Sequence, residues 1–192
     1  MRLSHPVAAL SAVSALALFA LTVPAGHAFA QKAKTEKAPS STVEVPIKTA
    51  TGEDAGTASF SEGSKGVNLT IVLKLKNLPP GDHAVHIHQN PVCDAPAFTT
   101  AGGHLNPDGK QHGMDNPMGH HAGDLPQNIT ISADGTGTIT YKVKYLTLKP
   151  DDPTSVLGHA IMVHEKADDM KTDPTGNAGA RIACGVIPKP AM

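Results

Sequence analysis

The sequence lacks several features that are typical of common protein classes. Its 16 basic and 17 acidic residues leave a formal net charge of -1, so no basic excess favours nucleic acid as a partner. No segment shows a convincing helical periodicity of apolar residues, which argues against a helical fold. With only two cysteines in 192 residues, at most one disulfide can form within the chain.

The longest apolar segment is too short for a membrane span. It extends without charge from Val7 to Val23 and ends at Pro24, whereas a transmembrane helix needs about 20 apolar residues. The small-residue triplet Ala28-Phe29-Ala30 follows. We therefore expect residues 1–30 to be a secretory signal peptide that is removed from a secreted protein with no membrane attachment. The lack of a cysteine near the cleavage point argues against a lipid anchor.

Export affects the interpretation of the two cysteines. In an oxidising compartment, the isolated pair Cys93 and Cys184 predicts one disulfide. This bond would close a loop of about ninety residues, which contributes roughly 4 to 5 kcal/mol in the chain-entropy model. The alternative is two free thiols.

Beyond the signal peptide, the chain divides into a tether and one domain. Residues 31–41 are polar and lysine-rich, which predicts a disordered tether. Residues 42–192 contain short segments of alternating polarity, which predict an all-β domain of about eight antiparallel strands in a barrel or sandwich. Residues 89–127 and 166–180 interrupt the pattern and are expected to be two long functional loops.

Histidine is concentrated in one part of the sequence, because seven of the eleven lie between His83 and His121. If HAVHIHQN is a strand, His86 and His88 share one face, while Val85 and Ile87 occupy the other. A metal could bind between the two imidazoles.

Further candidate ligands lie in the first loop and near the second. The loop contributes His104, His112, His120, His121 and Asp124. Three imidazoles and a carboxylate suit structural zinc, although spacing alone does not decide between His120 and His121. His164 could join His86 and His88 in a second, all-imidazole site that suits copper as well as zinc.

Five motifs in order resemble the copper-zinc superoxide dismutase family, bacterial secreted or periplasmic type. They are HAVHIHQ, AGGHLNPDGKQHG, HHAGDL, MVHEKADD and GNAGARIACGVI, and the resemblance covers nearly all of residues 42–187. It implies an eight-stranded Greek-key barrel that disproportionates superoxide to dioxygen and hydrogen peroxide by redox cycling of copper, with zinc structural. The implied ligands are His86, His88, His104 and His164 for copper, and His104, His112, His121 and Asp124 for zinc.

The resemblance also implies roles for residues outside the ligand sets. His104 would bridge both metals and take part in catalysis, and Arg181 would attract superoxide. Asp168 would accept hydrogen bonds from His86 and His112. Cys93 and Cys184 would form the family's disulfide. A homodimer is possible, but the chain end GVIPKPAM differs from the eukaryotic dimer edge.

Two other functions remain open from the residues alone. A zinc hydrase or hydrolase could use His86 and His88 with a metal-bound hydroxide, but it would leave the second ligand set unexplained. A non-enzymatic periplasmic protein that binds copper or zinc would not need Arg181. We expect His83 and His159 to be structural rather than ligands.

Overall fold

The structure is a computed structural model that describes residues 42–63 and 68–189. The predicted signal peptide and tether, residues 1–30 and 31–41, lie outside the described residues. No helix in the described part of the chain combines the length and apolar character needed to cross a membrane.

Strands dominate the described residues. In chain order they are β1 (Thr42–Thr49), β2 (Asp54–Glu62), β3 (Leu69–Leu75), β4 (Gly81–His83), β5 (Val85–His88), β6 (Ile129–Ile131), β7 (Gly137–Val143), β8 (His159–His164) and β9 (Arg181–Ile187). A single turn of 3-10 helix, η1 (Thr99–Ala101), lies in the first long loop. The prediction of an all-β fold is confirmed.

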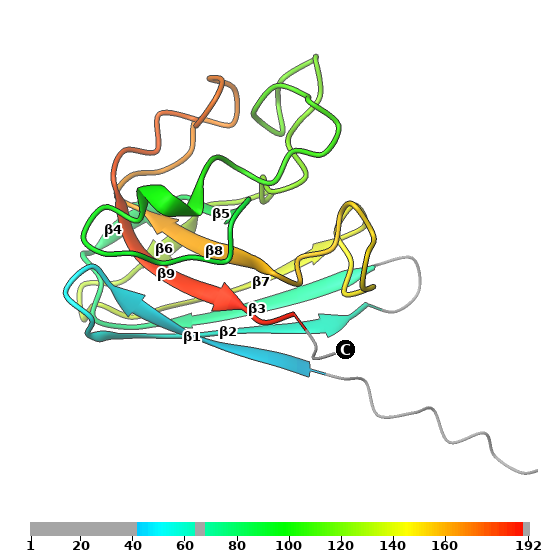
Figure 1. Cartoon of the computed structure of the whole chain (residues 1–192). Coiled ribbons are helices and arrows are strands. Elements are labelled where there is room, and N and C mark those ends of the chain that lie inside the picture. Colours follow the sequence, from blue (N-terminus) through cyan, green and yellow to red (C-terminus); the bar gives the residue numbers. More distant parts are fainter. Residues whose placement is uncertain (1–41, 64–67, 190–192) are drawn as a thin grey trace, which may run out of the picture. The chain divides into compact units, whose positions relative to one another are not determined.

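The strands form one large sheet and one small sheet, both antiparallel. The large sheet has the order β5-β8-β9-β1-β2-β3-β7, and β4 pairs with β6. The large sheet curls so that β5 and β8 cross over β2 and β3 (Figure 1). The hairpin between β6 and β7 is closed by the bond from Ser132 N–H to Thr136 O (2.8 Å), so the small sheet continues the barrel.

One expected strand is divided in two. Ala84 separates β4 from β5, and its N–H donates to Lys166 O at 2.8 Å, while its carbonyl accepts from His164 N–H at 2.9 Å. At Ala84, these hydrogen bonds to His164 and Lys166 at the end of β8 take the place of the pairing with β6 that residues 81–83 make. The described residues therefore contain nine strands where about eight were expected, with β4 and β5 as halves of one.

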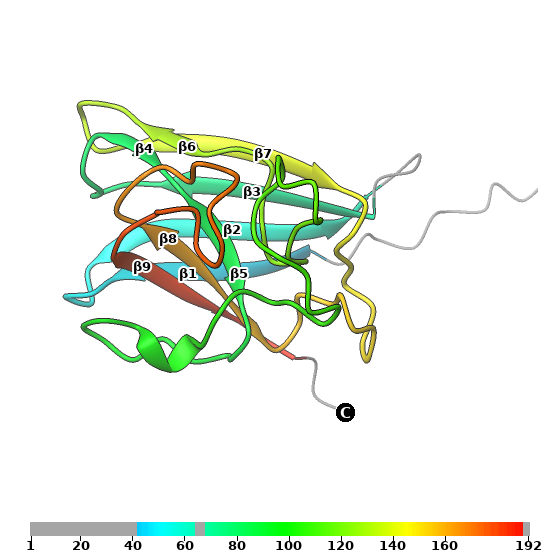
Figure 2. The same ribbon diagram turned by 90° about the horizontal axis from the view of Figure 1, so that it is seen from above.

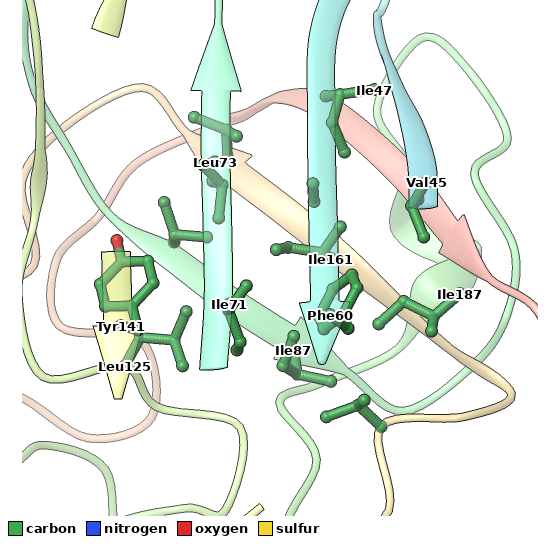
Figure 3. Packing of buried hydrophobic residues seen from close by; sticks show 14 of the residues in the cluster. Val45, Ile47, Phe60, Ile71, Leu73, Ile87, Leu125, Tyr141, Ile161 and Ile187 are labelled. Atoms are coloured by element: carbon green, nitrogen blue, oxygen red, sulfur yellow. The ribbon is translucent and has the colours of Figure 1, made fainter. Parts of the chain in front are cut away.

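Alternating side chains fill the space inside the curled sheet. In β3, the side chains of Leu69, Ile71, Leu73 and Leu75 are buried, while the residues between them are partly or fully exposed. Figure 3 shows Ile71 and Leu73 facing Ile161 of the crossing strand β8. Fully burying each such aliphatic side chain contributes about 1.5 to 3 kcal/mol, so this alternation is what fixes the strand register.

The two long loops lie on the same side of the barrel. Figures 1 and 2 show residues 102–127 and 165–180 side by side above the strands. They contact each other directly, since Asp115 N–H donates to Met170 O at 3.0 Å. Two segments far apart in sequence therefore cover the same side of the barrel.

The predicted disulfide is confirmed. Cys93 of the first loop is bonded to Cys184 of β9, with a Cα–Cα distance of 5.8 Å. The bond lies in a small apolar cluster with Phe98 and Met162. It therefore ties the start of the first loop to the barrel wall.

Candidate metal centre

Strand β5 separates candidate metal-ligating side chains from core side chains. Val85 and Ile87 belong to the apolar core, while His86 and His88 face the loops. The first loop lies along this strand, with Leu105 N–H donating to Ile87 O and Ile87 N–H donating to Gly123 O, both at 2.8 Å. A Cβ at Gly123 would lie 2.2 Å from Ile87 O, so this close approach requires glycine.

Four buried imidazoles form the first group. His86, His88, His104 and His164 each offer a ring nitrogen, and these atoms lie within 4.8 Å of one another. His88 Nε2 and His164 Nε2 are 3.3 Å apart. His86 Nδ1 and His104 Nε2 are buried without a hydrogen-bond partner. Nitrogens left unpaired in a buried position are costly unless an ion binds them.

A second group surrounds Asp124. Its Oδ1 lies 2.8 Å from His104 Nδ1, 3.0 Å from His112 Nδ1 and 3.4 Å from His121 Nδ1. The Nδ1 atoms of His121 and His104 are 3.3 Å apart. A tetrahedral site with bonds of about 2.0 Å has ligands about 3.3 Å apart. The spacings among Asp124, His104 and His121 therefore fit one ion, and His112 Nδ1 lies 3.0 Å from the same Asp124 oxygen.

His86, rather than His121, offers a ring nitrogen within 4.8 Å of the ligand atoms of His104, His112 and Asp124, but its hydrogen bonding assigns it to the first group. Its Nε2 donates to Asp168 Oδ2 at 2.8 Å, which leaves only Nδ1 for a metal. The other oxygen, Oδ1, is 3.0 Å from His112 Nε2. Asp168 thus joins one imidazole of each group, in the arrangement that the resemblance implied.

Sequence reasoning missed two residues that position Asp168. The Asn128 amide pairs with the Asp168 backbone, accepting its N–H at 2.8 Å and donating to its carbonyl at 3.0 Å. Gly176 has φ +63°, and a Cβ there would lie 1.9 Å from Asp168 Oδ1 and 2.7 Å from His112 Nε2. None of the motifs quoted above contains Asn128, whereas Gly176 begins the family motif GNAGARIACGVI.

Burial keeps most of the cluster neutral. Burial first, and the neighbouring imidazoles second, lower the pKa of His88 to about 2 and that of His104 to about 3. For Asp124, burial alone would raise the pKa, but hydrogen bonds from His104 and His112 outweigh it and keep the carboxyl ionised. Neutral imidazoles and an ionised carboxylate are the states that bind metals.

His112 differs because it lies between two carboxylates. Burial lowers its pKa, but hydrogen bonds to Asp124 and Asp168 dominate and raise the pKa to about 9. Without an ion, the ring therefore holds two protons near neutral pH. A metal at Nδ1 must displace one of them.

Arg181 is fixed beside a cavity of ≈ 380 Å³. Its Nη1 and Nη2 donate to Phe98 O and Gly102 O, both at 2.6 Å. Gly102 O also accepts from His88 Nδ1 at 3.0 Å, so the arginine and one imidazole share an acceptor. The cavity is lined by His88, Gln89, Gly103, His104, Asn106, His121, His164, Pro174, Thr175, Gly179 and Arg181.

The remaining described histidines lie outside both groups. Both ring nitrogens of His83 face carbonyl oxygens at 2.8 Å, and His159 Nδ1 donates to Gln89 O at 2.7 Å. His120 Nδ1 contacts His121 O at 2.7 Å, and its ring packs on Tyr145. Of the two adjacent histidines, the structure brings His121 to Asp124.

The fold and this site define a β-barrel protein with a paired-metal histidine centre, in which His104 belongs to both groups. The family model for copper/zinc superoxide dismutase (SODC) matches residues 54–187. The chain belongs to the copper/zinc superoxide dismutase family, as the sequence motifs predicted.

Several similar proteins are bacterial. Superoxide dismutase [Cu-Zn] 2 of Aquifex aeolicus is 45% identical over 142 residues, which cover 71% of this chain and 80% of that protein. Superoxide dismutase [Cu-Zn] of Caulobacter vibrioides is 42% identical over 146 residues, or 73% and 82% of the two chains. A crystal structure of a double mutant of a SOD-like protein from Bacillus subtilis has a TM-score of 0.72 and 40% identity, covering 76% of this chain and 96% of that chain.

Proposed function

We propose that this protein disproportionates superoxide to dioxygen and hydrogen peroxide. The observation that carries the proposal is the shared residue His104, which joins an all-imidazole group to a group built on Asp124. The cavity that opens onto the first group also contains Arg181, a cation suited to an anionic substrate. Family membership supports the same activity.

The donor atoms determine which metal each group would hold. The all-imidazole set of the first group suits copper, and its unpartnered nitrogens, His86 Nδ1 and His104 Nε2, fit a bound ion. Three imidazoles with the Asp124 carboxylate suit zinc in a closed structural site. We assign copper to His86, His88, His104 and His164, and zinc to His104, His112, His121 and Asp124.

Sharing His104 between the groups gives it a second role. Its Nδ1 faces Asp124 and its Nε2 faces the first group. With a metal held at each nitrogen, the His104 imidazole would be deprotonated, a state that two nearby cations favour at neutral pH. When bound, copper supplies the one-electron redox chemistry, and zinc keeps the His104 ring in place. His104 Nε2 would accept a proton when it is not bound to copper, and it would deliver that proton to the peroxide product.

Arg181 binds and orients the anion. Its two hydrogen bonds to backbone carbonyls hold the guanidinium rigidly at the cavity. A fixed positive charge at a cleft can raise the encounter rate with an anion about 10-fold to 1000-fold at low salt. The carbonyl of Gly102 also orients His88, so the substrate-binding cation and the copper group share one loop segment.

We also propose that the protein acts outside the cytoplasm, in the periplasm. The apolar run at residues 7–23 supports export, and a disulfide persists in an oxidising compartment. Mass spectrometry of the exported protein should find a chain that begins near Gln31, without a lipid. An intact Met1 would contradict export by this route.

A homodimer stays a prediction, to be tested by light scattering.

The decisive experiment measures superoxide consumption and metal content on the same metal-reconstituted sample. We expect equal amounts of copper and zinc, with superoxide consumption that depends on copper. Zinc alone, with no superoxide consumption, would favour a hydrolase. Copper without superoxide consumption would favour a metal-binding protein and would refute the proposed activity.

A further inference from the structure

Three of the six imidazoles in the two groups have an outer hydrogen-bond partner on the nitrogen that would face away from an ion. His86 and His112 use Nε2 to bond Asp168, at 2.8 and 3.0 Å. His88 uses Nδ1 to bond Gly102 O at 3.0 Å. Such partners fix the ring and its tautomer, and their loss typically costs about 10-fold to 100-fold in metal affinity.

For His121, the carboxylate in this position is that of Asp173. His121 Nδ1 faces Asp124 and His104, which leaves Nε2 pointing away from the second group. The distance from this Nε2 to Asp173 Oδ1 is 3.8 Å. A hydrogen bond between nitrogen and oxygen is about 2.7 to 3.2 Å, so a movement of less than about 1 Å would form it.

Asp173 is already anchored at the interface between the two loops. Its Oδ1 accepts the backbone N–H of His112 at 2.6 Å, which holds the carboxylate near the zinc ligands. The side chain of Asp173 is 46% exposed, in contrast to the buried Asp168. Its neighbours Pro174 and Thr175 line the cavity together with His121.

We infer that Asp173 is the positioning residue of His121, accepting its Nε2–H when zinc occupies Nδ1. The reason is chemical, because an imidazole that binds a metal through Nδ1 carries its remaining proton on Nε2. That proton lies on the nitrogen that faces Asp173. The inference depends on the zinc assignment proposed above.

The simpler view is that Asp173 only accepts the His112 N–H and thereby holds the loops together. Asp173→Asn separates the two roles, since the amide keeps an oxygen for the His112 N–H but removes the charge that strengthens a bond from His121. Asp173→Ala removes both contacts. Asp115→Asn is the matched control, because Asp115 is exposed in the adjoining loop and loses the same charge.

The test measures zinc affinity by chelator competition in the copper-loaded mature protein. Asp173→Asn should bind zinc about 10-fold more weakly, which is the lower end of the usual loss of about 10-fold to 100-fold, because the Asp173 side chain is half-exposed. Asp173→Ala should lose at least as much, and Asp115→Asn should match the wild type. Cobalt substituted for zinc should show a shifted visible spectrum in Asp173→Asn, which a purely structural contact would not cause.

His121→Ala distinguishes failure of the inference from failure of the zinc assignment. If His121→Ala loses zinc while Asp173→Asn binds it as tightly as the wild type, the role of Asp173 is overturned. If His121→Ala also keeps its zinc, the zinc assignment itself is wrong, and the inference falls with it. An equal loss in Asp115→Asn would make the effect one of general charge and would also overturn the inference.

Discussion

Breaking the disulfide between Cys93 and Cys184 should destabilise the protein by an amount that depends on the length of the loop that the bond closes. The two cysteines are 91 residues apart. For a loop of about this length, the chain-entropy model gives a loss of about 4.6 kcal/mol at 25 °C. Either Cys93→Ser or Cys184→Ala removes the bond completely, so the double variant should lose little more than each single one.

Chemical unfolding of the metal-free protein is the appropriate assay, because bound metals would add their own stabilisation to the native state. The wild type, both single variants and the double variant are compared by their free energies of unfolding. Reduced and alkylated wild type should agree with the variants. Losses below about 1 kcal/mol, or losses that add in the double variant, would refute the reasoning.

Three further predictions concern the site. His121→Ala and Asp124→Ala should each lose zinc yet still bind copper, and unchanged zinc content in both would show that the ligands are misassigned. Arg181→Ala should keep both metals and lower the second-order rate about 10-fold or more at low salt, and Arg181→Glu should lower it further; an Arg181→Glu rate equal to wild type would exclude steering by this residue. In the metal-free protein, the folded-state pKa values of His88 and His104, about 2 and 3, lie below 6.5. Stability present above pH 6.5 should therefore be lost as the pH falls toward 3, and urea unfolding at pH 7 and pH 5 should show this loss.

The strand residues of the site follow from the sequence through a simple periodicity. Because side chains alternate along a strand, His86 and His88 had to face away from Val85 and Ile87, and the structure places them so. By the same alternation, His83 was expected to point to the face opposite His86 and His88. The division of this strand at Ala84 was not predictable, because it depends on hydrogen bonds to Lys166 and His164 from another part of the chain.

The loop residues follow a different logic. Glycine-rich loops have no periodicity, so spacing left the choice between His120 and His121 open, and only the family motif resolved it. Asn128 and Gly176 both lie against Asp168, so their roles depend on how segments far apart in the sequence pack together. No local pattern in the sequence reports such a contact, which is why these two residues were missed.

The contacts of the cluster form a closed ring, which makes the two metal groups one mechanical unit. His86 bonds Asp168, Asp168 bonds His112, His112 bonds Asp124, and Asp124 contacts His104. The ring centroids of His104 and His86 are 3.9 Å apart, which completes the circuit. Losing zinc would remove the ion that fixes three of these side chains, and the displacement would reach His86 through Asp168. If zinc binds as proposed, we therefore expect it to influence the geometry of the proposed copper ligands by positioning His104, His112 and Asp124, without taking part in electron transfer.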